Sequence, residues 1–481
     1  MTKKLIYLMV SVILMLTACK QEKYNKDPNR PTEVGAQAIL PNVIFNSFKN
    51  RYPWQPGLAV RHATATSDRQ AYQTYEWANG DWAEFNILRD VTKMMESAAG
   101  AKEYLAIGKI LRAHNFFFLT RMYGAVPYSE ALNGQQSNNY QPKYDSQKQV
   151  MLGILQELEE ANQLLSTPGA AITGDILYNG DLKKWRKLAN SYKLRVLLML
   201  SKKESDTDLQ IAKRFNDIVS SPTLYPIFEG DEDEAKISYR DYENIRYPLY
   251  MDFNVRNKRF IGKTLADILK KLEDPRLFYF ATPFLNAAAQ GKRGFDAYQG
   301  IDASKSLTAA TEDGASGNYS RVNGHNYTEL PIGKPSLGFS YAELMLAMAE
   351  AAERGWIQAN ASTFYEHAVQ SSFKFYDLAG SDQAYLVRNP LSSVKEIALS
   401  QIYEQRYILF NAQSDFEVFF HYHRTNFPVI VSGQGQATAV VPFRFLYPTD
   451  EQRVNAANYQ DALKTQGFTS DNILMKPWLY Q

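Results

Sequence analysis

The feature that most constrains the fold is a set of long amphipathic segments that follow one another in pairs. Between Tyr104 and Tyr123, apolar residues recur every three or four positions and give one apolar helical face, formed by Ile107, Leu111, Phe118 and Met122. Gly124 supplies a helix stop and Pro127 prevents continuation. Residues 146–165 repeat the pattern, so we expect two antiparallel helices joined by a turn.

Three further pairs follow the first. They are expected at 183–203 with 208–220, at 339–354 with 361–378, and at 393–410 with 414–421. Asp181 is placed to cap the helix that begins near residue 183. Four such hairpins resemble tetratricopeptide repeats, although their spacing follows no strict period. The expected fold class is all-α, or mainly helical.

Two long segments lack helical periodicity. Residues 222–259 are rich in Tyr, Pro and charge, and residues 283–335 are rich in Gly, Ser, Asn and Asp. Long loops on a rigid helical scaffold are common sites of ligand binding. We therefore expect a loop-rich face beside the hairpins.

The N-terminus has the form of a lipoprotein signal. Lys3 and Lys4 precede the apolar run Leu5–Met15, which is too short to span a bilayer and is typical of a signal peptide. The run ends in Leu-Thr-Ala-Cys, a lipobox whose cysteine, Cys19, is expected to be acylated. An ordinary signal peptide with a chance cysteine is the alternative. Acylation has the further merit of removing the only thiol of a secreted chain.

These signals divide the chain into three expected parts. Residues 1–18 are the signal peptide, 19–33 a lipidated polar tether, and 34–481 the folded body. The chain has 53 basic and 51 acidic residues, and the signal peptide removes two lysines, so the mature chain is balanced at 51 of each. This neutrality argues against nucleic acid as a partner, and against membrane contact other than through the lipid.

Five local motifs occur in order behind the lipobox: DPNRPT at 27–32, RMYGAVPYSEAL at 121–132, WRKLANSYKLR at 185–195, an Ala-rich helix at 342–356 and PFRFLYP at 442–448. Together they resemble the SusD/RagB family of nutrient-binding outer-membrane lipoproteins, in its second-type branch. Asn426-Phe427 and Phe443 depart from the usual family pattern. We also expect Arg444 to pair with Glu451.

The resemblance implies a single SusD-like domain, with hairpins on one side and a ligand face on the other. It also implies a cell-surface position at the outer membrane. The expected partner is a SusC-like TonB-dependent transporter, which the lipoprotein would cover as a lid. An oligosaccharide is the favoured ligand, with a peptide as the alternative.

No catalytic or metal-binding motif is evident in the sequence. It contains no zinc-protease, nucleophile-elbow or phosphate-loop pattern, and the acidic run at 229–234 does not have EF-hand spacing. We therefore expect a binding protein with no cofactor and no metal. Two alternatives remain: a glycan-active enzyme, which needs only two suitably placed carboxylates, and a tetratricopeptide-type interaction scaffold.

Aromatic residues mixed with polar ones mark three candidate ligand segments, at 68–85, 239–256 and around residues 298–319. The candidate ligand-binding residues are Tyr72, Tyr75, Trp77, Asn79, Tyr242 and Tyr298. The turn signal Asn79-Gly80 favours exposure of Tyr75 and Trp77, which would form a platform completed by Tyr72 and Tyr298. The alternative is that these aromatics clamp the loops onto the helices.

Overall fold

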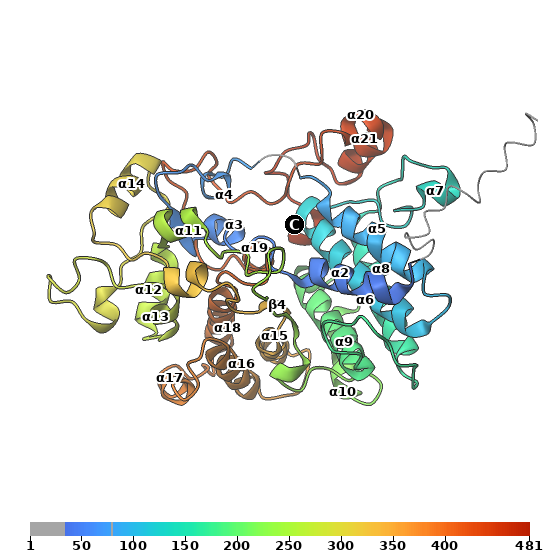
Figure 1. Ribbon diagram of the computed structural model, residues 1–481, viewed down its shortest axis with the longest axis horizontal. Coiled ribbons are helices and arrows are strands. Elements are labelled where there is room, and N and C mark those ends of the chain that lie inside the picture. Colours follow the sequence, from blue (N-terminus) through green and yellow to red (C-terminus); the bar gives the residue numbers. More distant parts are fainter. Residues whose placement is uncertain (1–33, 78–79) are drawn as a thin grey trace, which may run out of the picture.

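The computed structural model describes residues 34–77 and 80–481 (Figure 1). Its long helices pack as the sequence predicts, with α6 on α8, α9 on α10 and α15 on α16. The long helices are α2 (Ala36–Phe48), α5 (Ala83–Glu96), α6 (Lys102–Tyr123), α8 (Gln147–Leu164), α9 (Leu182–Met199), α10 (Ile211–Ser220), α15 (Tyr341–Arg354), α16 (Ala361–Phe375), α18 (Lys395–Leu409) and α19 (Glu417–Thr425). The mainly helical fold class is confirmed.

Local chemistry explains where the paired helices begin and end. The Asp181 carboxylate accepts hydrogen bonds from the amides of Lys183 (2.9 Å) and Lys184, which confirms the predicted cap of α9. Ser146 and Gln149 form a reciprocal capping box at the start of α8. Helix α6 ends at Gly124, whose φ of 92° lies in the region that favours glycine.

The fourth pair differs from its predicted boundaries. The expected helix at 414–421 instead runs from Glu417 to Thr425, because Ser414 and Asp415 both have positive φ values and cannot continue a helix. The two residues form a tight turn that places Phe416 directly before the helix. This turn lies beside the pocket described below.

The segments predicted as loops contain short elements. In Figure 1 helices α11 to α14 lie together on the left, the pairs α6/α8 and α9/α10 lie on the right, and α15, α16 and α18 lie between them at the bottom. The shorter helices are α3 (Gln55–Ala59), α4 (Ala71–Thr74), α7 (Gly134–Ser137), α11 (Phe253–Lys258), α12 (Lys263–Lys271), α13 (Arg276–Phe280), α14 (Leu307–Ala315), α17 (Asp382–Arg388), α20 (Glu451–Val454) and α21 (Ala456–Thr465).

Two small antiparallel sheets tie distant parts of the chain together. Strand β1 (Ala63–Ala65) pairs with β3 (Arg259–Ile261), and β2 (Ala235–Ile237) pairs with β4 (Ser336–Phe339). Each strand has only three or four residues, too few for an alternating pattern to be recognised in the sequence. Among the helices of the described residues, none has the length and apolar character needed to cross a bilayer.

A buried ion cluster joins the three long helices α15, α18 and α19. Glu350 of α15 is completely buried and pairs with Arg406 of α18 (2.8 Å) and with Arg424 of α19 (2.5 Å). Arg354 approaches the same carboxylate from the next turn of α15. Burial alone would raise the pKa of Glu350, but the neighbouring guanidiniums hold that pKa well below its usual range.

A second buried pair connects two helices that are distant in sequence. Arg121 of α6 makes two hydrogen bonds to Glu417 of α19, at 2.8 and 2.7 Å. Arg195 of α9 bridges Glu417 and Glu343 of α15. Together with the Glu350 cluster, these pairs join five of the long helices, α6, α9, α15, α18 and α19, through their charged side chains.

One predicted ion pair is wrong. Arg444 pairs with Asp471, with 2.5 Å between the nitrogen and the oxygen, and its partner is not Glu451. Glu451 instead accepts a hydrogen bond from the Tyr144 hydroxyl. Both carboxylates lie close behind Arg444 in the sequence, and only the path of the C-terminal segment decides which of them reaches the guanidinium.

The Glu350 cluster predicts a large effect of neutralising its centre. We expect Glu350→Gln to lower the free energy of unfolding by about 3–5 kcal/mol, because Arg406 and Arg424 would remain buried without a counter-charge. Chemical denaturation of the purified variant measures this loss. The control Asp217→Asn removes an exposed pair with Lys213 and should change stability by less than about 0.5 kcal/mol. Equal effects for the two variants would contradict the structural role assigned to Glu350.

Candidate functional site

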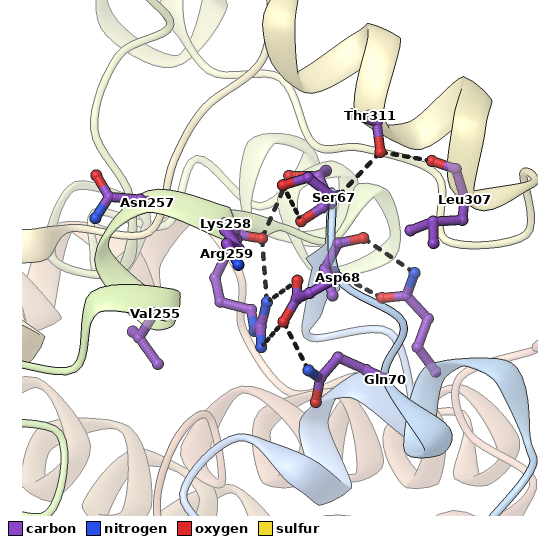
Figure 2. Close-up of polar contacts among 12 residues, drawn as sticks. Ser67, Asp68, Gln70, Val255, Asn257, Lys258, Arg259, Leu307 and Thr311 are labelled. Atoms are coloured by element: carbon purple, nitrogen blue, oxygen red, sulfur yellow. Dashed lines mark hydrogen bonds and ion pairs between the residues drawn. The ribbon is translucent and has the colours of Figure 1, made fainter.

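Residues in or next to the three candidate ligand segments come together at a polar contact. Figure 2 shows Arg259 of β3, which lies just after the second segment, making two hydrogen bonds to Asp68 of the first, at 2.8 and 2.9 Å. Gln70 also donates to Asp68, and the Ser67 amide donates to Thr311 of α14. This contact fixes the start of the segment that leads through α4 toward the pocket.

A pocket of about 150 Å³ lies between α4, the start of α5, the end of α6 and the turn before α19. Most of its lining is aromatic. The lining residues are Tyr52, Tyr72, Gly80, Asp81, Glu84, Phe118, Met122, Tyr123, Phe416 and Phe445. Binding sites for whole drug-sized ligands occupy roughly 300–1,000 Å³, so this pocket fits a single ring of a larger ligand.

Larger hollows elsewhere on the surface lack this chemistry. A hollow of about 940 Å³ beside α2 and α5 has no aromatic residue in its lining, and neither has one of about 820 Å³ at the turn between α8 and α9. A groove of about 410 Å³ along α8 to α10 contains one aromatic residue, Tyr225. Ring recognition needs apolar faces beside polar groups, and the small aromatic pocket has both.

The floor and the rim of the pocket differ in exposure. Phe416, Phe445 and Tyr123 are buried in the core, whereas Tyr52 and Tyr72 are half-buried and face the opening. Rings of Tyr52 and Phe416 pack edge to face with centroids 5.2 Å apart. The buried rings therefore support the two half-exposed tyrosines from behind.

The tyrosine hydroxyls of the pocket are available for a ligand. Within residues 34–77 and 80–481, no group forms a hydrogen bond with the hydroxyl of Tyr52, Tyr72 or Tyr123. Burial, followed by the charge of Asp81, raises the pKa of Tyr72 to about 12. Burial also raises the pKa values of Tyr52 and Tyr123. All three hydroxyls are neutral at physiological pH and can donate a hydrogen bond.

Gly80 allows the backbone to approach the pocket closely. A Cβ atom at this position would lie 1.5 Å from the Tyr123 hydroxyl oxygen. The Gly80 amide donates to the Leu446 carbonyl at 2.9 Å, which holds the backbone there. Any side chain at residue 80 would displace the Tyr123 ring from the pocket.

The charged groups of the pocket are mostly carboxylates. Glu84 pairs with Arg51 at 2.7 Å, and the Arg51 guanidinium also lies 3.9 Å from Asp415. Asp415 in turn accepts hydrogen bonds from the amides of Arg51 and Tyr52. Asp81 is exposed and accepts one hydrogen bond, from the Ala83 amide. The arrangement combines aromatic faces with hydrogen-bonding groups, as binding of a hydroxylated ring requires.

The exposed platform expected from the sequence does not form. Tyr72 lines the pocket, but the expected exposure of Tyr75 and Trp77 is wrong, because their side chains are 1% and 4% exposed. The Tyr75 hydroxyl donates to the Ala59 carbonyl, and Trp77 Nε1 donates to the Arg444 carbonyl at 2.9 Å. Trp77 packs behind Tyr72, with ring centroids 5.5 Å apart, and so supports the pocket from within.

The other three candidates do not complete the platform. Tyr298 is buried against Phe278, with centroids 5.4 Å apart, so the expectation that it is exposed is also wrong. Tyr242 is 70% exposed but does not line the pocket. Asn79 lies outside the described residues.

Several lining residues were missed by the sequence analysis. In the sequence, Tyr123 is the last residue of a predicted helix, and no local pattern marks Tyr52 or Phe445 as a ligand contact. They come from three separate parts of the chain that meet only in the folded protein. The available signal was modest: Tyr123 and Phe445 both fall within the family-like motifs at 121–132 and 442–448.

One buried cluster of possible metal ligands does not suit a metal. Glu343, Glu417 and His421 bring ligand atoms within 4.8 Å of one another. However, Arg195 and Arg121 already pair with the two carboxylates at 2.7 Å. Burial and the surrounding arginines lower the pKa of His421 well below its ordinary value. A cation would meet guanidiniums in this cluster, which acts as part of the structural ion network.

Comparison with known proteins identifies relatives that match most of the chain. The model of a SusD-like family, described as starch-binding and associating with the outer membrane, matches residues 28–448. No curated protein matches the chain. The comparison with solved structures gives matches along most of the chain, and three of them are informative.

A candidate outer-membrane protein for nutrient binding from Bacteroides vulgatus shares 34% identity with a TM-score of 0.87. A SusD homologue from Bacteroides fragilis shares 28% with a TM-score of 0.86. A chitin-binding protein shares 25% with a TM-score of 0.76. Each match covers 93% of this chain and 100% of the other. The family description and the last name specify binding, in agreement with the expectation that the chain is not an enzyme.

The burial of Trp77 predicts a loss of stability on its removal. We expect Trp77→Ala to lower the free energy of unfolding by about 3–5 kcal/mol, because it leaves a cavity behind Tyr72 and an unpaired Arg444 carbonyl. Thermal and chemical denaturation measure the change, with the exposed Tyr140→Ala as the control. Wild-type stability of Trp77→Ala would show that the indole is not a core residue.

Proposed function

Because this chain belongs to the SusD-like family of outer-membrane starch-binding proteins, we propose that it captures a nutrient glycan at the aromatic pocket. We further propose that it passes the glycan to a SusC-like TonB-dependent transporter. The observation that carries the first proposal is the pair of half-buried tyrosines, Tyr52 and Tyr72, above a floor of buried aromatic rings.

A glycan suits this pocket for physical reasons. Sugar rings have apolar C–H faces that stack on aromatic rings, and hydroxyls that exchange hydrogen bonds with tyrosine and carboxylate oxygens. The pocket volume limits contact to about one ring, so the rest of a chain would extend over the surface. The name of the chitin-binding relative supports a carbohydrate. A peptide remains the second candidate, since an apolar side chain would also fit aromatic walls.

The environments of the two pocket carboxylates, Asp81 and Glu84, suit ligand binding without catalysis better than they suit glycoside hydrolysis. A glycosidase needs one carboxyl group free to donate a proton and a second one free to act as base or nucleophile. The Glu84 side chain is 3% exposed and held by Arg51. Its role is therefore to position Arg51 and the pocket wall, which leaves Asp81 as a hydrogen-bonding group at the rim.

Loss of a rim aromatic tests the binding site. We expect Tyr72→Ala to weaken glycan binding by about 2 kcal/mol, roughly 30-fold, with little change in stability because the ring is half-buried. Titration calorimetry against starch, chitin and xylan oligosaccharides, followed by a peptide digest, identifies the ligand and measures its affinity. Tyr242→Ala is the matched control and should bind as the wild type does. Weakened glycan binding in Tyr242→Ala, with wild-type affinity in Tyr72→Ala, would place the site at Tyr242 instead.

We propose that the mature chain is anchored by lipid on Cys19 and that residues 20–33 tether the body. Two or more acyl chains anchor a protein stably, whereas a single chain gives only marginal binding. In a native host, Cys19→Ala should leave the membrane fraction and appear as unacylated protein. Fractionation followed by mass spectrometry of the N-terminal peptide provides the measurement. Membrane retention of this variant equal to that of the wild type would exclude the anchor.

The proposed partner is an outer-membrane transporter. Extraction of native membranes in mild detergent, followed by affinity purification of this chain, should recover a much larger outer-membrane protein in stoichiometric amount. An untagged copy of this chain, purified in parallel, serves as the control and should recover no such protein. Recovery of a monomer alone in several mild detergents would count against the partnership.

A further inference from the structure

We propose that the aromatic pocket discriminates by charge, accepting neutral or amino-bearing sugar rings and rejecting acidic ones such as uronates and sulfated sugars. This inference rests on the proposed binding of a glycan at the pocket. It adds the chemical class of the ligand, and it follows from how charge is distributed around the pocket.

The lining of the pocket contains negative charge alone. Asp81 and Glu84 contribute carboxylates, and within the described lining residues there is no Lys, Arg or His. Asp81 is exposed, and no basic group of the described residues lies within ion-pair distance of its carboxylate. Its charge therefore faces the ligand without a protein counter-charge.

Among the described residues, the guanidinium that pairs with a carboxylate of the pocket lining is already shared. Arg51 pairs with Glu84 at 2.7 Å and lies 3.9 Å from Asp415, behind the pocket wall. The Arg51 guanidinium also stacks on the ring of Phe118, a lining residue, with its central carbon 5.2 Å from the ring centroid. One positive charge thus serves two carboxylates, and Asp81 adds a third negative group on the ligand side.

The negative charges of Asp81 and Glu84 also affect the tyrosine hydroxyls of the pocket. After burial, Glu84 is the largest cause of the raised pKa of Tyr123, and Asp81 also contributes. Asp81 likewise raises the pKa of Tyr72. An anionic group placed among these hydroxyls would meet the same repulsion as a tyrosinate does, whereas a neutral hydroxyl or an ammonium group would not.

Basic groups elsewhere do not compensate for this charge. Arg69, near the start of α4, is engaged by Glu76 at 2.5 Å on the exposed surface. Arg444, beside Phe445, is engaged by Asp471. An acidic sugar in the pocket would therefore lack the bidentate arginine contact that carboxylate and sulfate recognition usually employs.

Removing the exposed charge tests the inference. Asp81→Asn keeps the side-chain shape and can still accept the hydrogen bond from the Ala83 amide. The control Asp90→Asn removes an acid from α5, the helix that follows Asp81, outside the pocket lining. Both variants and the wild type are titrated against neutral starch, xylan and chitin oligosaccharides, cationic chitosan oligosaccharides, and anionic polygalacturonate and chondroitin sulfate oligosaccharides.

The wild type should bind at least one neutral or cationic probe and should bind the anionic probes at least about tenfold more weakly. Asp81→Asn should reduce the preference for neutral or cationic probes over anionic ones by roughly fivefold, the size expected for one partly screened charge contact. Asp90→Asn should leave this preference unchanged. Tight binding of an anionic probe that is lost in Tyr72→Ala would overturn the inference and leave the proposed function standing. Binding of none of the glycans would overturn both.

Discussion

The arrangement of this molecule depends on buried arginine–carboxylate pairs between helices that are distant in sequence. Arg121 of α6 holds Glu417 of α19 through two hydrogen bonds. The residues next to these two partners are Met122 and Tyr123 on one side and Phe416 on the other, and all three line the pocket. The ion pair therefore fixes the distance between two walls of the site.

The Glu350 cluster acts on the same helix from its other end. Arg424 ties α19 to α15, and Arg406 ties α18 to the same carboxylate. Buried ion pairs contribute little net stability relative to apolar packing, but breaking one is strongly destabilising because a charge remains unpaired. Such pairs restrict the helices to one relative position, which is what a pocket built from several chain segments requires.

Aromatic packing holds the two half-buried tyrosines of the pocket, Tyr52 and Tyr72, in place. Phe416 packs against Tyr52 and lies 6.0 Å from Tyr72, between ring centroids. Trp77 fills the space behind Tyr72 and is anchored by the Arg444 carbonyl. The two half-buried tyrosines proposed to contact the ligand are thus held by rings that are almost completely buried.

The sequence was informative wherever local chemistry decides the structure. The helix cap at Asp181 and the helix stop at Gly124 follow from side-chain and backbone preferences within a few residues. The helical hairpins follow from periodicity over many residues, and the family from motifs whose order survives long insertions.

Features that depend on distant contacts could not be predicted in this way. Trp77 lies in a segment without periodicity, so nothing local indicates that its ring points toward Phe445 rather than outward. The partner of Arg444 depends on the path of the C-terminal segment, and the pocket depends on the meeting of Tyr52, Tyr72 and Tyr123. The aromatic and polar composition of residues 68–85 marked this segment as a candidate. Only the packing shows that Tyr72 lines the pocket whereas Trp77 is buried behind it.

The central claim is that the nutrient binds in the aromatic pocket between α4, α5, α6 and the turn before α19. A crystal structure of the complex with the tightest-binding oligosaccharide tests it most directly. The account predicts one sugar ring against Tyr72, with its hydroxyls within hydrogen-bond distance of the Tyr52 and Tyr123 hydroxyls or the Asp81 carboxylate. Density for the oligosaccharide on another surface, with the pocket holding only water, would contradict it.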